Sequence, residues 1–143
     1  MPEKYLFSTQ IPVRITDLNY GNHLGNDALL SIIHEARVRF LASYGYSEAN
    51  IENVGIMMAD AVIIYKSQAF YGDMLSIQIG IDDLSKKSCD FYYLIGNQAE
   101  KIVALCKTAI VFFDYHLQKP ALIPTKFLEK INKYNQLEAR RKK

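Results

Sequence analysis

The segment Thr16–Asn26 contains the residues of this chain that are best suited to chemistry. A carboxylate such as that of Asp17 can serve as a nucleophile or as a general base. By local sequence alone, an Asp ahead of a helix is also an ordinary turn or capping residue. The segment is also dense in turn-forming residues, which is typical of a loop. These residues are Asp17, Asn19, Gly21, Asn22, Gly25 and Asn26.

Metal and disulfide chemistry find less support in the sequence. The three histidines, His23, His34 and His116, form no i, i+4 pair, and no CxxC motif accompanies them. We therefore expect no metal site. Cys89 and Cys106 stand singly within apolar runs, which favours buried, reduced thiols over a disulfide.

A helix is predicted from Asp27 to about Tyr44, directly after the loop. Asn26 or Asp27 is a suitable N-cap, and Gly45 is a suitable end. The start of such a helix offers unpaired backbone N–H groups and the positive end of its dipole, which suit a developing oxyanion. Because apolar residues cover most of the circumference, we expect a buried helix. They are Leu29, Ile32, Ile33, Ala36 and Phe40 on one face, with Leu30, Val38, Leu41 and Ala42 on other sides.

Most of the remaining chain alternates between strand-like runs and short turns, which favours antiparallel pairing. The runs are Tyr5–Ile15, Met57–Tyr65, Leu75–Asp82, Cys89–Ile95 and Ile102–Phe113. In Leu75–Asp82 apolar and polar or small residues alternate with a period of two. Pro12 suggests that the first run is an edge strand or contains a bulge. A terminal helix begins at Pro124–Thr125, and its apolar side comprises Phe127, Leu128, Ile131, Tyr134 and Leu137. This order predicts an α+β fold in which a five-stranded antiparallel sheet wraps around one long central helix, followed by a C-terminal helix.

The bulk composition narrows the function classes. The chain has 143 residues, a formal net charge of +2 and 50% hydrophobic residues, which indicates a single globular domain over residues 1–143. The sequence has no basic stripe interleaved with aromatic residues, so nucleic-acid binding is not expected. No apolar run approaches the ~20 residues of a membrane span. The N-terminus lacks the pattern of a signal peptide, so we expect a cytoplasmic protein.

Three segments carry a resemblance to a known family. They are residues 13–26 (VRITDLNYGNHLGN), 33–40 (IHEARVRF) and 65–73 (YKSQAFYGD). They resemble the hotdog thioesterases of the 4-hydroxybenzoyl-CoA thioesterase branch. That branch has Asp-x-Asp in a loop, Gly-His-Val-Asn-Asn leading into the helix, Glu-Ala-Arg late in the helix and Gly-Asp before the third strand. The resemblance covers roughly residues 5 to 125, and the spacing matches without a gap from Asp17 to Arg37. Asn19 replaces the second Asp, and Gly25 replaces the first Asn.

The resemblance implies an acyl-CoA thioesterase in which Asp17 is the catalytic nucleophile or general base. It also implies that backbone N–H groups near Leu24, Gly25 and Asn26 form the oxyanion hole. For His23 three roles stay open, namely to polarise the thioester, to contact the substrate or to anchor the loop. Asn26 would be either a helix cap or a site residue. Glu35 and Arg37 are read as structural partners of loop and sheet, and Glu35 is the second-choice carboxylate.

The family also implies an assembly and a substrate. The active site would lie at a subunit junction of a homodimer or homotetramer, since an edge strand leaves backbone groups free to pair. We expect no cofactor, because CoA enters as part of the acyl-CoA substrate. The identity of the acyl group and the choice between CoA and an acyl carrier protein stay open.

Two other functions stay open. An enoyl-thioester hydratase or dehydratase of the same fold would pair a histidine with a carboxylate, and His23 lies six residues after Asp17. A non-catalytic acyl-CoA-binding protein would keep the fold, although Asp17 is present here.

Overall fold

The computed structural model describes residues 4–131. Along the chain lie β1 (Phe7–Pro12), η1 (a 3-10 helix, Ile15–Asp17), α1 (Asn26–Ser43), β2 (Gly55–Tyr65), β3 (Met74–Asp82), β4 (Ser88–Gly96), β5 (Ile102–Asp114), β6 (Lys119–Pro120) and α2 (Thr125–Lys130). The predicted order of strands and helices is confirmed. The two-residue β6 was not predicted. It forms because the chain turns back alongside the end of β5. Tyr134 and Leu137 lie outside the described residues.

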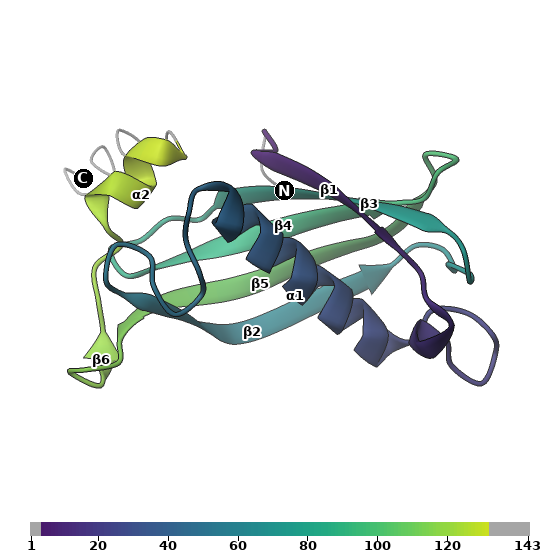
Figure 1. Cartoon of the computed structure of the whole chain (residues 1–143), viewed down its shortest axis with the longest axis horizontal. Helices are drawn as coiled ribbons and strands as arrows, with labels where there is room; N and C mark the ends of the chain where they lie inside the picture. The colour runs from purple at the N-terminus through teal and green to yellow at the C-terminus, as the bar shows by residue number, and fades with distance from the viewer. Residues whose placement is uncertain (1–3, 132–143) are drawn as a thin grey trace.

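The strands form one antiparallel sheet in the order β1-β3-β4-β5-β2, with β6 added on β5 (Figure 1). The period of two predicted for Leu75–Asp82 is confirmed in β3, and β4 shows the same alternation. Ile77 and Ile79 of β3, with Phe91 and Tyr93 of β4, are fully buried, while the residues between them are partly exposed. β1 and β2 are the two edges of the sheet, which agrees with the position expected for Pro12.

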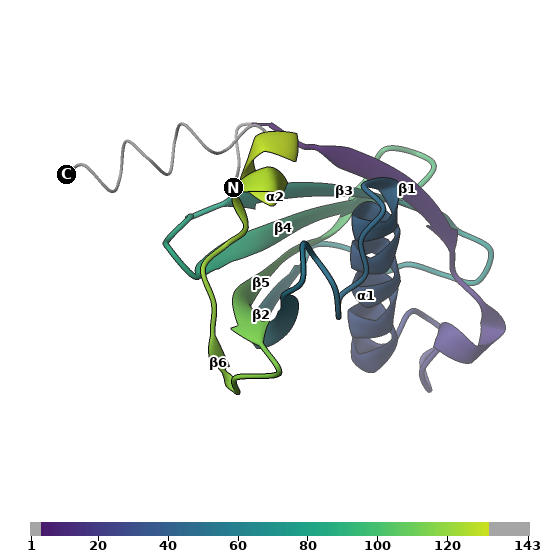
Figure 2. The ribbon, with the colours of Figure 1, turned by 60° about the vertical axis from the view of Figure 1, so that its left-hand side comes forward.

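The sheet curves around one side of α1 (Figure 2). On that side Leu29, Ala36 and Phe40 are 0% exposed, and Phe40 packs edge-on against Phe91 of β4. Leu30 and Val38, which lie on other sides of the helix, are each 40% exposed. The expectation of a helix buried all round is therefore met on one side only, because a single sheet reaches only one face of it.

The start of α1 differs from the prediction, whereas its end agrees with it. Gly25 is the N-cap and contributes no side-chain hydrogen bond, so the prediction of Asn26 or Asp27 at this position was wrong. Both residues already have helical backbone and form the first turn. Gly45 ends the helix as predicted, with a φ of 81°. The N–H of Gly45 donates to Ala42 O and that of Tyr46 to Leu41 O, at 2.9 Å each, which is a Schellman motif.

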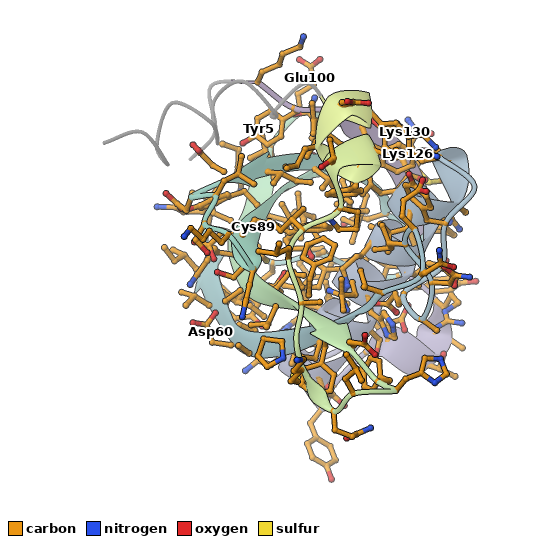
Figure 3. All side chains as sticks on the ribbon, turned by 90° about the vertical axis from the view of Figure 1, so that its left-hand side faces the viewer. Tyr5, Asp60, Cys89, Glu100, Lys126 and Lys130 are labelled. Atoms are coloured by element: carbon orange, nitrogen blue, oxygen red, sulfur yellow. The ribbon has the colours of Figure 1, made fainter. Side chains whose placement is uncertain are left out.

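Helix α2 covers the core at the end opposite the start of α1 (Figure 1). Phe127 and Leu128 are buried, and the ring of Phe127 lies 5.5 Å from that of Phe112. Figure 3 shows α2 from this end, with Lys126 and Lys130 labelled. The same view labels Cys89, which is buried and free like Cys106. Burial raises the pKa of both thiols, that of Cys106 to about 12. The predicted burial of both cysteines is confirmed.

Candidate active site

The loop between η1 and α1 is shaped by Asn19 at the start of its turn. The N–H of Asn22 donates to Asn19 O (3.1 Å), and the N–H of Gly21 donates to Asn19 Oδ1 (2.9 Å). The N–H of Asn19 in turn donates to His23 O (2.9 Å). A carboxylate at position 19 would accept the same hydrogen bond from Gly21. The exchange of Asp for Asn therefore preserves the turn.

Two further backbone hydrogen bonds anchor this loop. The N–H of Gly25 donates to Asp17 O (2.9 Å), and the N–H of Leu24 donates to Ala69 O (2.8 Å). Ala69 is buried in the connection between β2 and β3. The loop that carries Asp17 is thus tied both to the start of α1 and to the end of the sheet beside it.

The carboxylate of Asp17 is 5% exposed and is held by Arg14. Its Oδ2 accepts a hydrogen bond from the Arg14 backbone N–H (2.8 Å) and a longer one from Arg14 Nε (3.4 Å). Its Oδ1 accepts from Arg14 Nη2 (3.2 Å). The hydrogen bond and charge of Asp17 raise the pKa of Arg14. Asp17 is the last residue of η1, and its carboxylate caps the start of that short helix, which fixes its orientation.

The three predicted oxyanion donors differ in their availability. The N–H groups of Leu24 and Gly25 are engaged by the two anchoring hydrogen bonds. The first helical hydrogen bond runs from Leu29 N–H to Gly25 O (3.1 Å). The N–H groups of Asn26, Asp27 and Ala28 lie before this first hydrogen bond, so none of the three has an intrahelical partner. At this helix start the available donors begin at Asn26.

A pocket of about 320 Å³ adjoins the start of α1. It brings together three predicted residues, His23, Leu24 and Asn26, with the C-terminal end of β2 and the segment that follows it. Asp17, Gly25 and Glu35 are not among its lining residues, although the backbone of Gly25 connects Leu24 to Asn26. The complete lining is His23, Leu24, Asn26, Tyr65, Lys66, Ser67, Gln68, Ala69 and Val103.

His23 is half-buried at the wall of this pocket. Its Nδ1 lies 3.4 Å from Leu24 O. A Cβ on Gly21 would lie 2.9 Å from His23 Nε2, so glycine at position 21 leaves the space that the imidazole occupies. Its ring is thereby placed between the loop and the pocket.

Tyr65 and Val103 are pocket residues whose position sequence reasoning did not identify. Tyr65 ends β2 and pairs with Ala104 of β5, while Val103 is the neighbour of Ala104. Burial, followed by the nearby Cys106 and Asp27, raises the pKa of Tyr65. The segment 65–73 was singled out by the resemblance, and this is the signal that could have placed Tyr65 at the site.

Glu35 lies on another part of the surface. It is 50% exposed and forms an ion pair with Arg39 one helical turn later (3.4 Å). Together with Arg14 and Arg39, it lines a separate pocket of about 270 Å³ between β1 and α1. The structure thus places Glu35 near the guanidinium of Arg14, outside the pocket that contains His23 and Asn26.

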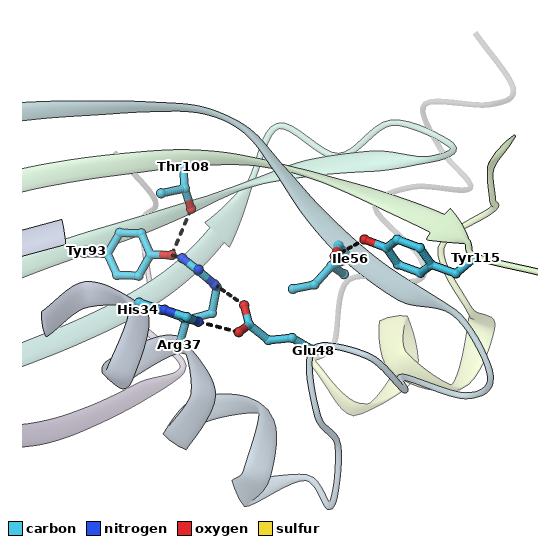
Figure 4. Close-up of polar contacts among 7 residues, drawn as sticks. All are labelled: His34, Arg37, Glu48, Ile56, Tyr93, Thr108 and Tyr115. Atoms are coloured by element: carbon cyan, nitrogen blue, oxygen red, sulfur yellow. Dashed lines mark hydrogen bonds and ion pairs between the residues drawn. The ribbon is translucent and has the colours of Figure 1, made fainter. Parts of the chain in front are cut away.

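Arg37 extends from α1 into the core and has a structural role, as predicted (Figure 4). Its Nε donates to Glu48 Oε2 (2.8 Å), and its Nη1 donates to Tyr93 OH (3.1 Å). Glu48 also contacts His34 Nε2 (2.6 Å), and Tyr93 OH lies 2.8 Å from Thr108 Oγ1. Burial acts to lower the pKa of Arg37, but the effects of Tyr93 and Glu48 prevail and raise it. This network fastens the connection between α1 and β2 to both the helix and the sheet.

Neither metal ligands nor a membrane-crossing helix is evident in the described part of the chain. Within residues 4–131, no three His, Cys, Asp or Glu side chains lie close enough together to hold a metal ion. No helix of that part is long and apolar enough to cross a membrane.

Comparison with known proteins places the chain in a family. The family model of the Thioesterase-like superfamily matches residues 13–131. A search of curated protein sequences found no match.

Solved structures support the same fold. A 1,4-dihydroxy-2-naphthoyl-CoA thioesterase from Synechocystis has a TM-score of 0.80 and 22% identity, over 90% of this chain and 97% of that one. A DHNA-CoA thioesterase from Staphylococcus aureus has a TM-score of 0.77 and 18% identity, over 92% and 90%. Another Staphylococcus aureus protein, solved in complex with CoA, has a TM-score of 0.82 and 19% identity, over 93% and 85%. The predicted hotdog fold is confirmed, and the chain belongs to the Thioesterase-like superfamily.

Proposed function

We propose that this protein is an acyl-CoA thioesterase that hydrolyses a thioester to a free acid and CoA. The observation that carries the proposal is the pocket at the start of α1, lined by Asn26 and His23. The loop that leads into this pocket begins at Asp17, whose carboxylate is paired with Arg14. A helix start supplies donors for an oxyanion. The similarity to a protein solved with CoA supports a CoA thioester as the ligand.

Two courses of reaction use Asp17. As a nucleophile, its carboxylate attacks the thioester carbon, CoA leaves as the thiolate, and water hydrolyses the resulting acid anhydride. As a general base, it takes a proton from the water that attacks the same carbon, and CoA leaves when the tetrahedral intermediate collapses. Both courses give a free acid and CoA, and in both negative charge develops on the carbonyl oxygen.

The proposed oxyanion donors are the backbone N–H groups at the first turn of α1, beginning at Asn26. Leu24 and Gly25 contribute differently, because their N–H groups hold the loop in place. We assign His23 to substrate contact, since its ring forms part of the pocket wall. Glu35 stays the second-choice carboxylate, although it lines the separate pocket that contains Arg14.

We further propose that two copies pair through β2 as a homodimer, which can assemble into a homotetramer. β2 is an edge strand, and edge strands pair readily with a second copy. The pocket adjoins this edge through Tyr65, so a partner subunit would complete its wall. Five side chains of β2 are 39–51% exposed, namely Met57, Met58, Val62, Ile64 and Tyr65.

The exposed side of α1 continues this apolar surface. Leu30 and Val38 lie two helical turns apart, and Leu30 shares a groove of about 230 Å³ with Met58 of β2. A second copy that covers this groove would bury the apolar residues that a single sheet leaves open. The buried free thiols of Cys89 and Cys106 agree with the cytoplasmic location that we propose.

The test is release of free thiol from short-chain, long-chain and aromatic acyl-CoAs by the purified protein. We expect turnover of at least one class. Conversion of crotonyl-CoA without thiol release would indicate the hydratase alternative. Saturable acyl-CoA binding without turnover would indicate the binding-protein alternative.

A further inference from the structure

Tyr65 is the last residue of β2, and its side chain projects from the face of the sheet that α1 covers. It pairs directly with Ala104 of β5, which is fully buried. Directly paired residues of antiparallel strands have their side chains on the same face of the sheet. Cys106, two residues further along β5, is buried on that face as well. The ring of Tyr65 therefore points to the inner side of the sheet, where the pocket at the start of α1 lies.

The neighbours of the Tyr65 hydroxyl place it beside the first turn of α1. Burial, followed by the nearby Cys106 on β5 and Asp27 in that turn, raises the pKa of Tyr65 above its ordinary value of 10.0. Because charge interactions weaken with distance, the hydroxyl lies close to both the sheet and the helix start. At neutral pH the phenol keeps its proton, so it is a hydrogen-bond donor at this place.

The Tyr65 hydroxyl also has a free donor, unlike other hydroxyl groups of the core and the pocket. Within residues 4–131 it forms no hydrogen bond, whereas that of Tyr93 forms two. The hydroxyl of Ser67, which lines the same pocket, already donates to Ile102 O (2.7 Å). A tyrosine hydroxyl that is covered by a ligand generally finds a partner. A substrate in the pocket would supply that partner.

The pocket brings this hydroxyl together with the backbone donor of Asn26. Both residues line it, Asn26 from α1 and Tyr65 from β2. The N–H groups of Leu24 and Gly25 are already engaged, so the loop supplies no backbone donor ahead of Asn26. A side-chain donor such as a tyrosine hydroxyl can complement backbone N–H groups around an oxyanion. The phenol of Tyr65 is such a donor at the sheet side of the pocket.

We propose that Tyr65 is a catalytic residue whose hydroxyl donates a hydrogen bond to the thioester carbonyl oxygen, alongside the backbone N–H of Asn26. This inference deepens the proposed function and rests on it. When the carbonyl carbon is attacked, negative charge develops on this oxygen and the hydrogen bond from the phenol strengthens. The proton stays on Tyr65 throughout. Because every acyl-CoA has this carbonyl, the contribution of Tyr65 does not depend on the acyl group.

Two other roles of Tyr65 predict different results. The hydroxyl could instead recognise a polar group on the acyl chain, in which case only substrates with such a group would depend on it. Tyr65 is also 45% exposed on an edge strand. It could therefore serve only in the pairing of two copies, in which case the assembly would be lost together with the activity.

The experiment compares Tyr65→Phe, which removes only the hydroxyl, with wild type. Thiol release is measured with butanoyl-CoA and 3-hydroxybutanoyl-CoA, and with benzoyl-CoA and hydroxybenzoyl-CoA. One member of each pair has no acyl oxygen besides the thioester carbonyl. We expect kcat to fall about 10²- to 10³-fold for both members of each pair that wild type hydrolyses. KM should change less than about threefold, because the interaction is made mainly in the transition state. Light scattering and Tm should match wild type.

Tyr71→Phe is the matched control, because Tyr71 is 64% exposed in the connection after β2 and does not line the pocket. Its kcat should equal that of wild type. A loss confined to the hydroxylated member of each pair would overturn the proposal in favour of acyl recognition. Dissociation of Tyr65→Phe, or a fall in kcat that parallels a fall in Tm, would overturn it in favour of a structural role. If Tyr65→Phe is as active as wild type, only this inference fails. If wild type releases no thiol from any acyl-CoA, the proposed function fails with it.

Discussion

At the scale of single residues, Asp17 is buried and its charged carboxylate is paired with Arg14. Its carboxylate is bonded only by Arg14 among the described residues, and its main chain links η1 to the start of α1. A carboxylate restrained in this way suits attack or proton abstraction, because little reorganisation is needed on the reaction path.

Replacement of Asp17 by Asn should lower kcat by at least 10²- to 10⁴-fold, the usual worth of a general base. The amide keeps the shape but loses the charge. The free energy of unfolding should fall by about 1 kcal/mol, because an NH₂ group replaces an oxygen that accepts from Arg14. Thiol release and urea unfolding measure the two effects. A folded variant within tenfold of the wild-type rate would exclude Asp17, and Glu35 would be tested next.

Isotope labelling separates the two chemical roles of Asp17. A single turnover in ¹⁸O-labelled water leaves label in the enzyme carboxylate if Asp17 is the nucleophile. If Asp17 is a general base, the label enters only the acid product.

At the scale of elements, the contacts of Glu48 join the α1–β2 connection to α1 through Arg37 and His34. Burial acts to raise the pKa of Glu48, but hydrogen bonds from Arg37 and His34 outweigh it, and the pKa lies below its ordinary value of 4.5. A carboxyl group whose pKa is lowered on folding stabilises the fold above its unfolded value. That contribution disappears as the pH falls through the folded value.

Replacement of Glu48 by Gln should therefore destabilise the protein at pH 7 and much less near pH 3. We expect a loss of about 1 to 2 kcal/mol at pH 7, below the full cost of breaking a buried pair because Glu48 is partly exposed. Urea unfolding at both pH values measures it. Glu129→Gln, an exposed substitution on α2, is the control. An equal loss at the two pH values would contradict the ion-pair explanation.

On the outer face of the sheet, the pKa of a carboxyl group is raised instead of lowered. Burial, with a hydrogen bond to Asp83, raises the pKa of Asp90 on β4 to about 6. The OH of Tyr92 also donates to Asp83. A raised carboxyl pKa stabilises the fold below the unfolded value of 3.8 and loses that effect as the pH rises through about 6.

Asp90→Asn should accordingly raise Tm relative to wild type at pH 7, because it removes a carboxylate whose ionisation destabilises the folded state. The difference should shrink as the pH is lowered from 7 to 4. Thermal unfolding across this range is the measurement. A variant that is less stable than wild type at pH 7 would show that the carboxylate is favourable there.

At the scale of the whole molecule, the exposed apolar side of α1 and the free edge β2 lie next to each other. Leu30 and Val38 are 40% exposed, so polar residues at these positions should be tolerated by a single folded chain. In a dimer formed through β2 they would be buried, and unpaired charges would then be costly.

The double variant Leu30→Lys, Val38→Lys should therefore remain folded, dissociate and lose activity, because the pocket would lack the wall contributed by a second copy. Light scattering and thiol release test this on the same sample. Leu117→Lys, at a residue that is 63% exposed in the turn after β5, should change neither property. A wild-type protein that is an active, stable monomer would refute the proposed assembly.

The sequence by itself determined those features that depend on near neighbours along the chain. Alternation in Leu75–Asp82 predicted β3, because successive strand residues point to opposite faces. Gly45 marked the end of α1, because a left-handed backbone there favours glycine. The loop around Asp17 followed from its turn-forming residues, and the function proposed for it rests on a resemblance spread along the chain.

Tertiary structure alone decided which distant residues meet. Arg37 and Tyr93 are 56 positions apart and form a hydrogen bond, while Val103 reaches the pocket of His23 only through the pairing of β2 with β5. The guanidinium of Arg14 lies on Asp17 because η1 turns the chain back within three residues. Such contacts depend on strand register and sheet curvature, which arise from the packing of the whole core and have no period along the sequence.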